Sequence, residues 1–250
     1  MKKTPIIAGN WKMNKLPSEG SSYVYEISKL IKDIKVVKVI YAPPFTGLFD
    51  LKVKPPFYIA AQNCHWEDGG ALTGEISLQM IKDCGAEYVI VGHSERRHIF
   101  NETNDWVNKK TKAVLAKGMN PILCVGETIT QRESGETESV LKDQLEKGLD
   151  TIGDVKNCII AYEPVWAIGT GLTASNEQVE IAHKFIREVI GNKYGNGDGT
   201  HILYGGSVNS SNAKSLIQTK GVDGFLIGGA SLDAGSFASI INIVEEVQES

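Results

Sequence analysis

Short, continuous apolar runs alternate with longer amphipathic segments from one end of the 250-residue chain to the other. A run that is apolar at every position, rather than at alternate positions, is typical of a parallel strand that is buried on both faces. The pattern predicts strands at Pro5–Asn10, Val36–Ala42, Phe57–Ala61, Tyr88–Gly92, Asn120–Cys124, Cys158–Tyr162, His201–Tyr204 and Gly224–Ile227.

Apolar residues recur every three or four positions between these runs, which is the period of a helix with one buried face. The first segment places Val24, Ile27, Leu30 and Ile31 on one such face. Helices are predicted at Ser18–Ile31, Thr46–Leu51, Ser77–Cys84, Asn104–Ala116, Glu136–Leu149, Ser175–Val189, Ser210–Gln218 and Ser236–Val247.

Eight strand–helix units divide the chain into repeats of about 31 residues, the size of a βα unit. We therefore expect an α/β protein whose residues 1–250 form one (β/α)8 barrel domain. A doubly wound open sheet is the alternative. The lack of an antiparallel strand among the eight expected strands favours closure.

Composition narrows the class of protein. The 26 Lys and Arg against 30 Asp and Glu give a net charge of −4, which argues against nucleic acid as a partner. No apolar stretch is long enough to span a membrane or to form a signal peptide. The four cysteines, Cys64, Cys84, Cys124 and Cys158, show no C-x-x-C spacing. Free thiols and a cytoplasmic location are therefore expected.

Three chemically capable side chains follow predicted strands, whose carboxyl ends meet at the mouth of a barrel. Lys12 follows the first strand and offers a cation. His93 follows the fourth and precedes a helix start, whose dipole favours the neutral imidazole. Glu163 follows the sixth and is a candidate general base. Each has a structural alternative: a solvated lysine, a histidine satisfied by backbone, and an ion-paired carboxylate.

Glycine is over-represented, with 26 residues in 250. Two glycine pairs follow the last two strands, Gly205-Gly206 before Ser207 and Gly228-Gly229. Bare backbone N–H groups at these positions are typical of a phosphate site after strands seven and eight of a barrel. Tight turns that need small residues are the alternative interpretation.

The segment after Glu163 combines apolar bulk with glycine and is predicted to form a lid over the mouth. Its residues are Pro164, Val165, Trp166, Ala167, Ile168, Gly169, Thr170, Gly171, Leu172, Thr173 and Ala174. The same segment matches G-x-G-x-x-A, but it does not directly follow a strand, so a dinucleotide site is not favoured.

These features together predict proton transfer beside a carbonyl group in a small phosphorylated substrate, with no metal and no cofactor. Another phosphate-binding barrel, such as a sugar-phosphate epimerase or an amino-acid-pathway isomerase, remains open on the residues alone. So does a barrel that only binds a phosphorylated metabolite.

Seven motifs resemble the triosephosphate isomerase family. They are GNWKMN, TGEIS, VGHSERR, CVGET, AYEPVWAIGTG, YGGSV and FLIGGASL, in order from residue 9 to residue 232. The resemblance implies a barrel enzyme that interconverts dihydroxyacetone phosphate and glyceraldehyde 3-phosphate in glycolysis and gluconeogenesis. In that family a carboxylate base, a neutral histidine and a closing loop act together.

The resemblance also implies a role for each matching residue. Glu163, His93, Lys12 and Glu95 would be catalytic, and Asn10, Trp11, Lys12, Gly169, Ser207, Gly228 and Gly229 would bind the substrate. It further implies a homodimer, in which Thr73 reaches the site of the partner. Departures from the family pattern are Leu72, Asn101 and Leu172, none of them at a position with an implied catalytic role.

Overall fold

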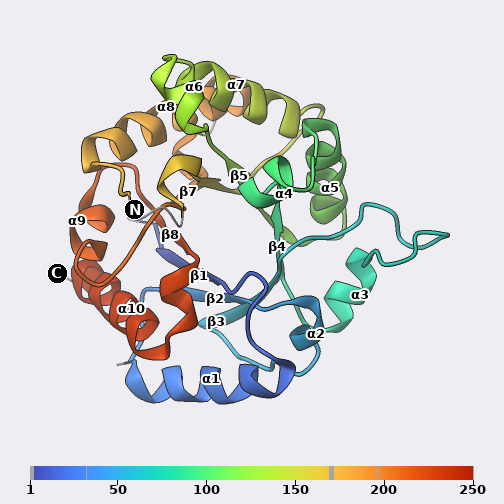
Figure 1. Ribbon diagram of the computed structural model, residues 1–250, viewed down its shortest axis with the longest axis vertical. Coiled ribbons are helices and arrows are strands. Elements are labelled where there is room, and N and C mark those ends of the chain that lie inside the picture. The colour runs from blue at the N-terminus through green and yellow to red at the C-terminus, as the bar shows by residue number, and fades with distance from the viewer. Residues whose placement is uncertain (1–2, 32, 169–171, 196, 250) are drawn as a thin grey trace.

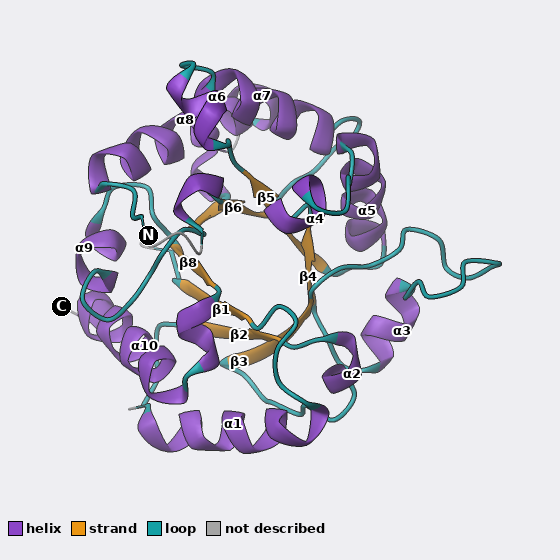
Figure 2. Cartoon of the chain, viewed as in Figure 1, coloured by secondary structure: helices purple, strands orange, loops and turns teal. Residues whose placement is uncertain are grey.

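The computed structural model describes residues 3–31, 33–168, 172–195 and 197–249. Within this part, eight parallel strands pair in sequence order, and the last pairs with the first, so the sheet closes into a barrel. Helices form a ring around the strands (Figures 1 and 2). The strands are β1 (Ile6–Asn10), β2 (Lys38–Ala42), β3 (Phe57–Ala61), β4 (Tyr88–Val91), β5 (Asn120–Val125), β6 (Ile159–Tyr162), β7 (His201–Tyr204) and β8 (Gly224–Ile227).

The described helices lie between successive strands and after the last strand. They are α1 (Pro17–Leu30), α2 (Phe45–Leu48), α3 (Leu78–Asp83), α4 (Ser94–His98), α5 (Asn104–Ala116), α6 (Ile129–Glu133), α7 (Thr137–Gly148), α8 (Asn176–Tyr194), α9 (Ala213–Gln218) and α10 (Ala234–Glu249). Three short 3-10 helices complete the set, η1 (Val165–Ala167), η2 (Gly197–Gly199) and η3 (Gly229–Leu232). In the described residues, no helix has the length and apolarity needed to cross a membrane.

The apolar side chains form two buried clusters, because successive residues of a strand point to opposite faces. Ala8, Ile40 and Leu226 belong to the smaller cluster, which fills the barrel interior. Ile7 and Val39, one position away in their strands, belong to the larger cluster between the strands and the helices. The strands are buried on both faces, which explains their unbroken apolar runs.

The structure confirms the expected barrel and places every predicted strand within two residues of its predicted ends. The helix predicted at Ser210–Gln218 begins later, at Ala213. The Asn209 side chain accepts hydrogen bonds from the amides of Ser211 and Asn212, which holds a turn there instead. The helix predicted at Ser175–Val189 continues to Tyr194, where Gly195 ends it in a left-handed conformation.

Candidate active site

The carboxyl ends of five strands surround one cavity of about 190 Å³. Its lining comprises Asn10, Lys12, His93, Glu163, Ile168, Gly205, Gly206, Ser207, Val208, Leu226, Ile227, Gly228, Gly229 and Ala230. These residues lie on or just after β1, β4, β6, β7 and β8. The barrel therefore brings a lysine, a histidine and a glutamate together that are more than 60 residues apart in the sequence.

Glu163 sits at the end of β6 with 2% of its surface exposed. Its Oε1 lies 3.0 Å from Nε2 of His93, and its Oε2 accepts a hydrogen bond of 3.0 Å from the amide of Ser94. Burial alone raises the pKa of Glu163, but His93, the Ser94 amide and Lys12 outweigh burial and lower that pKa below its usual range. The buried carboxylate is therefore held in its ionised form.

His93 is the cap of α4, because its Nδ1 accepts a hydrogen bond of 3.2 Å from the amide of Glu95. A nitrogen that accepts a hydrogen bond carries no proton, so the neutral ring bears its proton on Nε2, which faces Glu163. Burial lowers the pKa of His93, whereas the Glu163 carboxylate raises it, and the carboxylate prevails. The Glu163 carboxylate thus favours the protonated ring, whereas the Glu95 amide, which donates to Nδ1, favours the neutral ring.

Lys12 has a left-handed backbone, with φ at 52°, which is a strained conformation for a residue with a side chain. Its amide donates to Oδ1 of Asn10 at 3.0 Å, and its carbonyl accepts from the amide group of Gln62 at 2.9 Å. The ammonium group lies 2.6 Å from Oε1 of Glu95. These contacts aim the lysine side chain into the cavity.

Two glycines of the rim allow the backbone to approach the reactive groups. A Cβ at Gly205 would lie 2.8 Å from Cγ of Glu163, and a Cβ at Gly228 would lie 3.2 Å from Cε of Lys12. Side chains at these positions would displace the base and the cation. The glycine surplus is therefore needed partly for space around Glu163 and Lys12.

The first half of the predicted lid lies beside the cavity. Ile168 lines the cavity, while the indole of Trp166 points elsewhere and donates a hydrogen bond of 3.0 Å to Oε1 of Glu127. Glu127 is fully buried, accepts from the hydroxyl of Tyr162 and pairs with Arg132. The predicted lid residues Gly169, Thr170 and Gly171 lie outside the described residues.

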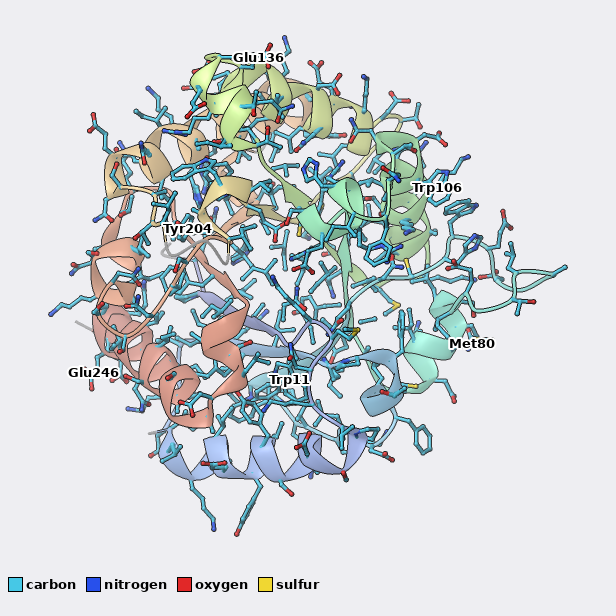
Figure 3. The ribbon with its side chains drawn as sticks, viewed as in Figure 1. Trp11, Met80, Trp106, Glu136, Tyr204 and Glu246 are labelled. Atoms are coloured by element: carbon cyan, nitrogen blue, oxygen red, sulfur yellow. The ribbon has the colours of Figure 1, made fainter. Side chains whose placement is uncertain are left out.

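Trp11 corrects one prediction. Its side chain is 1% exposed and packs edge-on against Tyr23 of α1, with the ring centroids 5.1 Å apart, rather than lining the cavity. Figure 3 labels it between the strands and α1. Since successive residues alternate in direction, Asn10 faces the cavity and Trp11 faces the helix layer. The prediction that Trp11 binds substrate was wrong.

Gln62 and Glu127 were not singled out from the sequence. The Gln62 amide group donates to two carbonyls, those of Lys12 and Ala42, and so joins the ends of β1 and β2. Glu127 joins the β5 end to the lid. The partners of Gln62, and Trp166 as a partner of Glu127, lie 20 to 50 positions away, and no local pattern marks such pairs. A capping box, Thr128 with Gln131, does mark the overlooked helix α6.

Thr73 is exposed and lies far along the chain from the strand ends, in the segment between β3 and α3. Residues 67–75 of this segment are exposed, and the segment projects from the body of the barrel (Figure 1). The structure therefore does not bring Thr73 to the cavity of its own chain.

A closed (β/α)8 barrel with a buried carboxylate, an imidazole and an ammonium around a glycine-rimmed cavity defines a barrel enzyme suited to proton transfer on a small anionic substrate. The family model described as Triosephosphate isomerase matches residues 5–244. The chain belongs to the triosephosphate isomerase family, a family of isomerases.

Individual relatives agree with the family match. The chain is 46% identical to the triosephosphate isomerase of Trichlorobacter lovleyi over 96% of this chain and 98% of the relative. It is 47% identical to that of Geobacter metallireducens and 49% identical to that of Chloroherpeton thalassium, each over 96% of this chain and 98% of the relative. These matches do not favour the alternatives of an epimerase or a barrel that only binds a metabolite.

Proposed function

We propose that this chain interconverts dihydroxyacetone phosphate and D-glyceraldehyde 3-phosphate by proton transfer through an enediolate. The observation that carries the proposal is the joint position of Glu163, His93 and Lys12 around one cavity whose lining also includes both glycine pairs. A base, a neutral donor and a cation are the groups that this reaction needs.

Glu163 is proposed to take the proton from one substrate carbon and to return it to the neighbouring carbon. Its carboxylate is ionised and lines the cavity, as a base must be. His93 is proposed to polarise the carbonyl through Nε2–H and to move protons between the two oxygens. The Glu95 amide on Nδ1 supports this role, because it leaves the ring proton on Nε2, the nitrogen that lies beside Glu163 at the cavity.

Lys12 is proposed to stabilise the negative charge of the enediolate and of the phosphate. Asn10, whose side chain accepts from the Lys12 amide, is proposed to hydrogen-bond the substrate. Glu95 is proposed to orient the lysine, and the distance of 2.6 Å between Lys12 Nζ and Glu95 Oε1 supports that role.

The phosphate group is proposed to bind at the amide-rich rim, through Ser207, Gly228 and Gly229, with Gly169 of the lid as a further contact. Ser207 and both glycines line the cavity, and η3 begins at Gly229, so backbone N–H groups are available there. No metal or cofactor is needed for this assignment.

The lid, Pro164–Ala174, is proposed to close over the bound substrate and to exclude water. An open site would let the enediolate expel phosphate, and closure holds the phosphate in the plane that disfavours this loss. The hydrogen bond of Trp166 to Glu127 supports the proposal, because it gives the near end of the lid a fixed anchor outside the cavity.

Purified protein should convert glyceraldehyde 3-phosphate to dihydroxyacetone phosphate, because the proposed groups act directly on this substrate. The measurement is NADH oxidation in an assay coupled to glycerol-3-phosphate dehydrogenase. Ribulose 5-phosphate, a substrate for an epimerase, serves as the control; its reaction is followed by NMR, since the coupled assay detects only dihydroxyacetone phosphate, and it should not react. Conversion no faster than in buffer would contradict the proposal.

The active form is proposed to be a homodimer in which the segment Asn63–Ile76 enters the partner, so that Thr73 reaches the region of Asn10 and Lys12. A second cavity of about 190 Å³ beside the first supports this arrangement. It is lined by Met13, Phe45 and Phe100, together with Asn10, Lys12 and His93 of the active site. Met13 is 95% exposed in the single chain, which is unusual for so apolar a residue.

Thr73→Arg should weaken self-association, since a long charged side chain would have to enter the cavity between the two chains, and specific activity should fall in parallel. Sedimentation velocity and activity are measured on the same samples over a dilution series. Lys54→Arg, on a different loop, is the control. A wild-type monomer with full activity would contradict the proposed dimer.

The single-domain organisation and a cytoplasmic location are also proposed. The sequential pairing of all the described strands in one barrel supports the former. The free state of the four cysteines, three of them buried, supports the latter, because free thiols persist in reducing compartments.

A further inference from the structure

Arg97 of α4 is a partly buried arginine with an uncommon set of partners. Its Nε donates to the carbonyl of Gly92 at 2.7 Å, and its Nη2 donates to the carbonyl of Cys124 at 3.1 Å. Its Nη1 donates to Oδ1 of Asn104 at 2.6 Å. Within the described part of the chain, none of these acceptors is a carboxylate. The guanidinium group therefore joins the end of β4, the end of β5 and the start of α5 without neutralising its own charge.

The two carbonyls belong to residues next to the reactive groups. Gly92 directly precedes His93, and the thiol of Cys124 is in contact with the carboxyl group of Glu163. Gly92 itself has φ at 67°, and a Cβ there would lie 2.8 Å from Nη2 of Arg97. The guanidinium group is thus packed tightly against the backbone turn that carries His93.

Water screens the charge of Arg97 less than that of a fully exposed arginine, because the side chain is partly buried. Burial lowers the pKa of Arg97, and Cys124, Glu102 and Glu163 oppose that effect. Glu163 is therefore one of the negative groups that interact with the Arg97 cation. The other titratable groups around Glu163 are His93, Lys12, Cys124 and His98, with Glu95 beyond His93.

We propose that Arg97 is a positioning residue for the isomerisation. It ties the ends of β4 and β5 together so that His93 and Glu163 keep their spacing, and its positive charge favours the ionised form of the base. This inference rests on the proposed function. Arg97 itself does not line the cavity, so its effect on the substrate passes through these two neighbours.

Arg97→Met in the full-length protein tests this role. We expect kcat to fall about ten- to a hundredfold, because small displacements of reacting groups have effects of this size. KM should change less than about twofold, since the phosphate rim is untouched. The acid limb of the pH profile of kcat/KM should move to higher pH. Loss of a positive charge raises the pKa of both Glu163 and His93, so the direction holds whichever group sets the limb.

Two further variants separate charge from geometry. Arg97→Lys keeps the charge but cannot reach all three acceptors, so kcat should fall while the acid limb stays near its wild-type position. Arg97→Ala should regain part of its activity when guanidinium chloride is added at a non-denaturing concentration. Ammonium chloride at the same concentration should not restore activity, because ammonium lacks the planar shape of the guanidinium group. A surface hollow of about 480 Å³, lined by Arg97, His98, Gln131 and Gln144, gives the guanidinium ion access to the vacated position.

Arg187→Met is the matched control. Arg187 also donates to carbonyls, those of Gly197, Thr200 and Gly221, and pairs with Asp223 at 2.8 Å. Because none of these partners lines the cavity, the control should lower Tm and leave kcat and the acid limb unchanged. Should Arg97→Met fail to fold, Arg97→Lys and Asn104→Ala, which removes one acceptor of the guanidinium, supply the kcat and pH readouts.

Wild-type values of kcat and of the acid limb in the Arg97 variants would overturn the inference. So would an equal loss of kcat in Arg187→Met, since this would indicate a general effect of lost stability. If the wild type is active and the Arg97 variants have the same kcat and acid limb as the wild type, this inference alone is overturned. A wild-type protein without isomerase activity would overturn the proposed function, and this inference with it.

Discussion

Replacement of Glu163 by glutamine should lower kcat for glyceraldehyde 3-phosphate on the order of 10²–10⁴-fold, the usual effect of removing a positioned base. The amide has nearly the shape of the carboxylate and can still accept from the Ser94 amide, so the barrel should remain folded. It has no lone pair basic enough to take a proton from carbon. The loss should therefore appear in kcat, with KM changed little.

The measurement is the coupled assay together with deuterium incorporation into the substrate in heavy water. Proton transfer at carbon produces this incorporation, so it should fall in parallel with kcat. Glu163→Asp keeps the charge but shortens the side chain, so its kcat should lie between that of the wild type and that of Glu163→Gln. Near-wild-type turnover of Glu163→Gln would remove Glu163 from the role of base.

Glu245→Gln is the matched control for the loss of a buried carboxylate. Glu245 is 4% exposed on α10, and its oxygens accept from the amides of Lys35, Val36 and Val37. These hydrogen bonds join α10 to the segment before β2, and none of the residues involved lines the cavity. This variant should lower Tm without lowering kcat, which separates the chemistry of Glu163 from the burial of its charge.

The strands could be predicted from the sequence because the barrel imposes one rule on all of them. Each strand is covered inside by the barrel core and outside by helices, so it is apolar throughout. The positions of Lys12, His93 and Glu163 could be predicted as well, since the first residues after a strand lie at the barrel mouth. Trp11 differs: the family resemblance implied that it binds substrate, whereas the alternation along β1 turns its side chain away from the cavity.

The environment of each group could not be predicted. Nothing near Glu163 in the sequence shows that the Ser94 amide and the His93 ring meet its carboxylate, since 69 and 70 positions separate them. Arg97 reads as an ordinary charged residue of a short helix, and only the fold places carbonyls of two strands around it. Residue types at strand ends are local information, whereas pKa values and hydrogen-bond partners depend on contacts between distant segments.

Replacement of Lys12 by methionine should lower kcat/KM on the order of 10²–10³-fold, the usual effect of removing one preorganised group that stabilises developing negative charge. Methionine fills most of the same space but carries no charge. Both parameters should change: KM should rise because the substrate is an anion before it reacts, and kcat should fall because the enediolate gains further charge. This split distinguishes Lys12 from Glu163, whose loss should affect kcat alone.

The measurement is kcat/KM at low and high ionic strength. Salt screens the attraction between Lys12 and the anionic substrate, so high ionic strength should lower kcat/KM of the wild type and have little effect on that of Lys12→Met. Lys15→Met is the matched control. Lys15 also has a left-handed backbone, with φ at 68°, but its ammonium group donates to the carbonyl of Leu232 and lies 3.9 Å from the centroid of the Tyr23 ring. Lys15→Met should therefore lower Tm and leave kcat and KM unchanged. If Lys12→Met and Lys15→Met changed kcat/KM equally, the strained backbone of the loop, rather than the charge aimed into the cavity, would account for the effect.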